Sequence, residues 1–269
     1  MKLNVVQPGK TFNCNQCGKC CSHIRGMMPQ QDKEFMEKMA YGKLPLVQLT
    51  PLEKISFPLF DWEASRFKKW QREVNIDGKI KPSRTILDLN TNKAIIVTYF
   101  IDSDACPFLL EKKCVLYQTK RAYICRLFPF NRGPFLKTGS EPNKNNMFET
   151  CDGIKTLIPL IPEDYDSMVR FLSKAFPDSS FENSVQFDYI TGWNNKTVID
   201  LIKKKMIRPA MNYPYEFFLK RFENAEKIDF TDFLVESGYI DDKEKLIKKF
   251  DDNEDAKKII ENFLEQSLN

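Results

Sequence analysis

The chain has 269 residues, of which 42% are hydrophobic and 29% charged, a composition that allows an ordinary buried core without disulfide support. A net charge of +4 over this length is too small to indicate a nucleic acid partner. The longest apolar run, residues 94–101, falls far short of a membrane-spanning helix, and the N-terminal segment lacks the apolar stretch of a signal peptide. We therefore expect a cytoplasmic protein with no membrane partner, in which thiols stay reduced.

The first notable segment is NCNQCGKCCS, residues 13–22, which holds four cysteines. Apolar spacing then predicts one helix over residues 29–43 and another over residues 60–74. The segments RTILDL and AIIVTYFI are rich in β-branched residues and are separated by the turn-prone NTNK. They predict an antiparallel β-hairpin.

Prolines and glycines punctuate the chain from Cys106 to Cys151, which predicts loops around a second set of cysteines. Further on, amphipathic spacing predicts helices over residues 163–176, 196–206, 215–225 and 242–268, with Pro214 at a helix start. We therefore expect an α+β fold in two domains. Residues 1–157 form a cysteine-rich metal-binding domain with a small antiparallel β-hairpin and loops, and residues 158–269 form a mainly helical C-terminal region.

The chain has eight cysteines: Cys14, Cys17, Cys20, Cys21, Cys106, Cys114, Cys125 and Cys151. Thiolates at C-x2-C spacing reach a common ion in structural zinc sites and in iron–sulfur clusters. The doubled C-x2-C step and the surplus of ligands favour an iron–sulfur cluster, as a 4Fe–4S cubane, and zinc is the alternative. Adjacent side chains point in different directions, so Cys20 and Cys21 serve two metals, or one binds and the other shields. We expect the two sets of cysteines to converge within one site region.

Basic residues surround the second set of cysteines. A divalent ion with four thiolates carries net negative charge, which neighbouring cations stabilise. Arg126, directly after Cys125, is the best candidate for that role, and an anionic substrate is the alternative explanation. His23 is the only histidine of the chain, which excludes multi-histidine metal sites and any histidine-dependent catalytic triad at another place in the chain.

Four blocks, CNQCGKCC, CPFLLEKKCVLY, CRLFPF and CDGI, resemble the YkgJ-type cysteine-cluster family, to which zinc or iron chelation is attributed. The resemblance covers about residues 12–155 and gives every cysteine a counterpart. Ala122 stands where the family has a proline. The resemblance does not extend to the C-terminal helices after residue 158.

The family includes the flagellin lysine N-methylases, so the resemblance implies an enzyme that modifies a protein substrate, with S-adenosylmethionine as a cofactor. For that hypothesis we expect a cofactor cleft lined by Arg126, Tyr117 and the C-terminal helices. The sequence has no glycine-rich turn of the Rossmann type, so any S-adenosylmethionine would be bound in another way. A non-catalytic electron carrier, a metal-handling protein and a metal-stabilised interaction platform are the alternatives.

Overall fold

The computed structural model describes residues 11–26, 34, 44–117, 120–131, 133 and 151–266. The chain divides into two compact units, and each unit is assembled from separate stretches of sequence. The first unit comprises Met1–Cys20, Tyr123–Gly192 and Lys248–Asn269. The second unit comprises Cys21–Ala122 and Trp193–Ile247. The boundary expected between residues 157 and 158, with the cysteine-rich part before it and the helical part after it, stays a prediction.

The second unit is built on a five-stranded sheet, with strands β1 (Val47–Gln48), β2 (Pro58–Phe60), β3 (Ile80–Leu87), β4 (Lys93–Ile101) and β7 (Glu226–Asp229). The long strands β3 and β4 pair antiparallel, and β1 extends the sheet beyond β3. β2 pairs antiparallel with the C-terminal part of β4, while β7 pairs parallel with its N-terminal part. The predicted hairpin is therefore the centre of a larger sheet.

The turn of this hairpin is held by Asp88, whose side chain is fully buried. Its Oδ2 accepts hydrogen bonds from the Thr91 backbone N–H at 3.0 Å and the Thr91 hydroxyl at 2.6 Å. Its Oδ1 accepts a hydrogen bond from the Arg208 backbone N–H at 2.7 Å. One carboxylate thus closes the turn and fixes the segment that follows α6.

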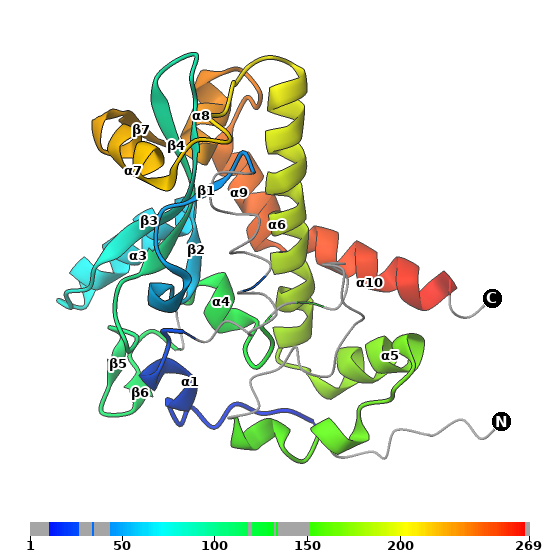
Figure 1. Ribbon diagram of the computed structural model, residues 1–269. Coiled ribbons are helices and arrows are strands. Elements are labelled where there is room, and N and C mark those ends of the chain that lie inside the picture. The colour runs from blue at the N-terminus through cyan, green and yellow to red at the C-terminus, as the bar shows by residue number, and fades with distance from the viewer. Residues whose placement is uncertain are drawn as a thin grey trace. The chain divides into compact units, whose positions relative to one another are not determined.

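The sheet of the second unit is covered by α3 (Asp61–Glu73), α7 (Tyr215–Asn224), α8 (Phe230–Glu236) and the C-terminal part of α6, a helix that spans Ser180–Lys203 in all. The core joins Ile95 and Val97 of β4 to Leu201 of α6 and to Phe230 and Leu234 of α8. Figure 1 shows α7 and α8 beside the end of the sheet that carries β7. The 3-10 turn η1 (Leu52–Lys54) and the short hairpin of β5 (Leu109–Leu110) and β6 (Lys113–Cys114) complete this unit.

The first unit is mainly helical. Its elements are α4 (Tyr123–Arg126), the 3-10 turns η3 (Asp152–Ile154) and η4 (Ile158–Leu160), α5 (Tyr165–Ala175), the N-terminal part of α6 and α10 (Glu254–Gln266). Phe176 lies between two other buried rings, with centroids 5.3 Å from Phe12 and 4.7 Å from Phe130. The Phe12 backbone N–H donates to the Ala175 carbonyl at 2.7 Å, which fixes the chain just before the first cysteine against the end of α5.

The α+β class is confirmed, as are the hairpin, the helix over residues 61–73 and the helices α5 and α7. The predicted single helix over residues 242–268 is wrong, because α9 (Lys243–Asp251) ends near Asn253, whose φ of 54° is left-handed, before α10 begins. The helix predicted over residues 196–206 begins earlier, at Ser180. The helix predicted over residues 29–43 lies outside the described residues except for Glu34. Within the described ranges, every helix is too short or too polar to cross a bilayer.

Candidate metal centre

The N-terminal cysteines lie on a tight turn that runs into a short helix. Gln16 and Gly18 both have left-handed backbone angles, with φ of 55° and 71°, and the Cys17 N–H donates to Asn15 Oδ1 at 3.2 Å. Glycine adopts this conformation without steric cost, so Gly18 lets the chain reverse between two cysteines. Cys20 and Cys21 then lie in α1 (Lys19–Ser22), where successive side chains are about 100° apart around the axis.

Cys14 and Cys17 lie close to Cys151, within the first unit. Lys19 forms an ion pair with Asp152, the residue after Cys151, and Lys155 Nζ lies 2.7 Å from the other carboxylate oxygen. Lys155 and Lys19 lower the pKa of Asp152 to about 2. Both pairs are exposed and contribute little stability. Only the Lys19–Asp152 pair joins the two cysteine segments, because Lys155 and Asp152 lie in the same turn.

Close packing around Cys151 depends on Gly153. A Cβ atom at this position would lie 3.2 Å from the Phe12 ring and 3.6 Å from Cys151 Sγ. Partial burial raises the pKa of the Cys151 thiol, the backbone N–H groups of Gly153 and Ile154 lower it, and the neighbouring Cys14 and Cys17 raise it further. We call Cys14, Cys17 and Cys151 the Cys151 group.

Cys21 meets the second set of cysteines within the second unit. The Cys106 N–H donates to the Cys21 carbonyl at 2.8 Å, and the Cys106 carbonyl accepts from the Leu109 N–H at 3.0 Å. Leu109 pairs with Cys114 across the β5–β6 hairpin, which brings the third sulfur to the same place. Burial raises the pKa of the Cys106 thiol to about 12, and Cys21 and Cys114 raise it in addition. We call Cys21, Cys106 and Cys114 the Cys106 group.

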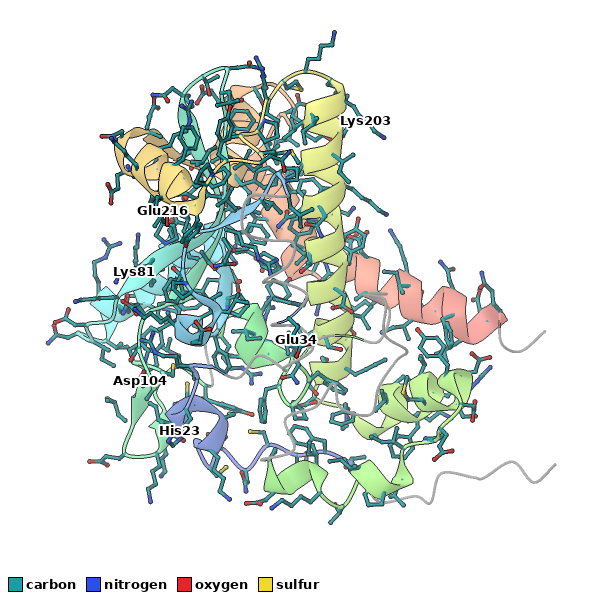
Figure 2. All side chains as sticks on the ribbon, viewed as in Figure 1. His23, Glu34, Lys81, Asp104, Lys203 and Glu216 are labelled. Atoms are coloured by element: carbon teal, nitrogen blue, oxygen red, sulfur yellow. The ribbon has the colours of Figure 1, made fainter. Side chains whose placement is uncertain are left out.

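An arginine clamp holds the chain after Cys21 against the loop before Cys106. Arg25 Nε lies 2.6 Å from Asp104 Oδ1, and its Nη2 lies 3.1 Å from Asp102 Oδ1. Its Nη1 donates to the Lys54 carbonyl at 2.8 Å, and the Ile24 N–H donates to the Asp104 carbonyl at 2.8 Å. Figure 2 labels Asp104 and, just after α1, His23. The clamp was missed in the sequence, where the only signal is an arginine four residues after Cys21 and two aspartates shortly before Cys106.

The other predicted site residues have their own partners. Arg126 stacks on the Tyr123 ring, 3.8 Å from its centroid, and lies 3.7 Å from Asp251. The Arg121 guanidinium lies over the Tyr117 ring, 4.5 Å from the ring centroid. Arg126 belongs to the first unit and Tyr117 to the second, so a cleft that both residues line stays a prediction.

The remaining two cysteines, Cys20 and Cys125, belong to the first unit. The histidine, His23, lies beside Ser22. Ser22 Oγ and His23 Nδ1 are 3.0 Å apart. Members of the two sets lie near each other within each unit, Cys21 with Cys106 in the second and Cys14 and Cys17 with Cys151 in the first. Convergence of both sets within one site region stays a prediction.

The donor chemistry fits a thiophilic metal. All eight cysteines lie among the described residues and none is in a disulfide, and within each group the sulfurs oppose one another's ionisation. A bound cation removes this repulsion, because metal binding takes up thiolates and releases their protons. Among the described residues, no three His, Cys, Asp or Glu side chains already stand in metal-binding geometry, so ligation requires the sulfurs to close on the ion.

Comparison with known protein families identifies the family of this chain. The model of the CxxCxxCC family, described as "Putative zinc- or iron-chelating domain", covers residues 13–152, more than half of the chain and all eight cysteines. Comparison with the curated proteins and with the solved structures gives no match.

Proposed function

We propose that this chain, which belongs to the CxxCxxCC family of zinc- or iron-chelating domains, binds metal through its cysteine thiolates. The observation that carries the proposal is the position of the N-terminal cysteine segment. One part of it lies beside Cys151 and the next part is hydrogen-bonded to Cys106, more than eighty residues away along the chain. Clustered thiols that remain free in a reducing compartment are typical of metal ligands.

We propose an iron–sulfur cluster in preference to zinc. The doubled C-x2-C step from Cys14 to Cys20 is the spacing with which ferredoxins hold a cubane cluster, and the number of thiols exceeds what one zinc ion needs. The chemical difference is inorganic sulfide, which a cluster contains and a zinc–thiolate site lacks. Location in the cytoplasm agrees with this proposal, because reduced thiols persist there.

Elemental analysis of anaerobically purified full-length protein tests both statements. Iron with acid-labile sulfide and a brown colour supports the cluster, whereas stoichiometric zinc in a colourless protein reverses the choice of metal. Protein that contains neither metal refutes the function. Ser22→Ala is the matched control for cysteine variants, because it removes a polar atom directly beside Cys21 without removing a thiol.

Methyl transfer from S-adenosylmethionine to a protein lysine is the enzymatic form of this proposal, and it rests on the sequence resemblance alone. Among the described residues, no arrangement of side chains favours it over an electron carrier, a metal-handling protein or an interaction platform. Equilibrium binding of labelled S-adenosylmethionine to the metal-loaded protein tests it directly, and absence of binding refutes it.

A further inference from the structure

The two cysteine groups belong to different units, and the chain passes from one unit to the other between Cys20 and Cys21. The side chains of Cys20 and Cys21 are about 100° apart around the axis of α1, so these neighbouring thiols point to different sides of the helix. A single small ion needs its ligand sulfurs within about 2.3 Å, which two adjacent and divergent side chains rarely achieve together. The adjacent pair is therefore the point at which the thiols are divided.

The Cys151 group is open to solvent. Cys17 is exposed, and Cys14 and Cys151 are half-buried. The Lys19–Asp152 ion pair beside them has both side chains about half exposed, at 56% and 46%. Water and small molecules therefore reach this group without any unfolding of the chain.

The Cys106 group is more deeply enclosed. Cys106 is 7% exposed, its backbone N–H donates to the Cys21 carbonyl, and its carbonyl accepts from the Leu109 N–H. The Arg25 clamp, whose side chain is 25% exposed, holds the two approaching segments together. Cys21 and Cys114 are half-buried, so only access to the Cys106 sulfur requires local opening of the chain.

We infer that the cysteines form two separate metal centres, an accessible one on Cys14, Cys17 and Cys151 and an enclosed one on Cys21, Cys106 and Cys114. This inference rests on the proposed metal-binding function and goes beyond it, because it assigns ligands to each centre and gives the centres different exchange behaviour. The metal at the accessible centre exchanges with solution, while the metal at the enclosed centre holds the Cys21 segment to the β5–β6 hairpin.

The exchange rates follow from the way a chelator removes a metal ion. The chelator must replace thiolates one at a time, and the exposed Cys17 is available for this in the folded protein. At the enclosed centre, replacement of the buried Cys106 thiolate must wait for local opening, and opening free energies differ widely between parts of one protein. Release should therefore occur in two phases.

The test uses the full chain, reduced under anaerobic conditions and loaded with Zn²⁺ alone, with a chromogenic chelator as the acceptor. The wild type should carry about two zinc ions per chain and release them in a fast and a slow phase. Cys17→Ser should lose about one ion and the fast phase, whereas Cys106→Ser should lose about one ion and the slow phase. Cys114→Ser repeats the second measurement at a half-buried position, in case the substitution at buried Cys106 prevents folding.

Ser22→Ala, the control, should keep both ions and both phases. Loss of all zinc in both Cys17→Ser and Cys114→Ser would show one shared centre and overturn the inference while leaving metal binding intact. Retention of both phases in either of these variants would overturn the assignment of its ligands. Wild-type protein that takes up neither zinc nor iron would instead overturn the proposed function.

Discussion

Asp61 should make the stability of the protein depend on pH. It is the first residue of α3 and is fully buried. Its Oδ2 accepts hydrogen bonds from the Thr231 backbone N–H at 2.7 Å and from the Thr231 hydroxyl at 2.6 Å. Burial raises the pKa of Asp61 to about 7, an effect that the hydrogen bonds from Thr231 oppose and the nearby Asp229 reinforces.

The sign follows from proton binding. An aspartate in the unfolded chain has a pKa of about 3.9, so between about pH 4 and pH 7 the folded state holds a proton that the unfolded state has lost. The contribution of Asp61 to the free energy of unfolding is therefore fully present below the pKa of Asp61 in the unfolded chain, and it is lost as the pH rises through the pKa in the folded protein. The loss is about 1.4 kcal/mol per pH unit in this range, or about 2.5 kcal/mol between pH 5 and pH 8.

Urea denaturation of wild type and Asp61→Asn at several pH values between 5 and 8 measures this loss. The amide does not titrate, so the free energy of unfolding of the variant should rise relative to wild type by about 2.5 kcal/mol over the range. Both proteins carry the same eight cysteines, so the pH dependence of metal binding cancels in the comparison.

Asp77→Asn is the matched control, because Asp77 is an exposed carboxylate of the same unit. Its pH profile should run parallel to that of the wild type. If Asp61→Asn also runs parallel to wild type, the Asp61 carboxyl does not bind an extra proton on folding and the argument from burial is wrong.

Four further predictions concern single contacts and the metal. Asp88→Ala should lower the free energy of unfolding by about 3 kcal/mol, because it leaves buried donors without their acceptor; a loss below about 1 kcal/mol would contradict this. Gly192→Ala should stabilise α6 by about 0.5–1 kcal/mol, since its Cβ meets no atom within 4 Å. Gly133→Ala should lower the free energy of unfolding, since its Cβ would lie 2.8 Å from two oxygen atoms of α6. If urea denaturation shows both variants to change the free energy of unfolding in the same direction, this pair of predictions is refuted. Tyr123→Phe should cost about 1–2 kcal/mol, because its buried hydroxyl donates to the Phe250 carbonyl, and thermal denaturation indistinguishable from wild type would refute that bond. Removal of metal by a chelator should lower Tm, and an unchanged Tm would show that the metal does not stabilise the fold.

The elements that short stretches of sequence encode could be predicted. The β-branched strands on either side of NTNK predicted the β3–β4 hairpin, and helical spacing predicted α3, α5 and α7. Each pattern lies within a window of about ten to fifteen residues, where periodicity reports which face is buried. The family was recognisable for the same reason, because C-x2-C spacings are local features.

Long-range pairing could not be predicted in this way. β7, with the sequence EKID, has no strand-like alternation, and it is a strand because residues 226–229 pair with residues 93–96 of β4, before the part of β4 that pairs with β2. Asp61 resembles an ordinary acidic residue in the first turn of a helix, and only the approach of Thr231 shows that it is buried.

The candidate metal centre shows the same division. The sequence by itself determined that eight thiols must be accounted for and that adjacent Cys20 and Cys21 cannot easily serve one ion. Which thiols meet was decided by the tertiary structure, through the Cys21–Cys106 hydrogen bond, the Arg25 clamp and the Lys19–Asp152 ion pair. These contacts join residues more than seventy positions apart, and their geometry depends on how the intervening chain folds, which no local spacing encodes.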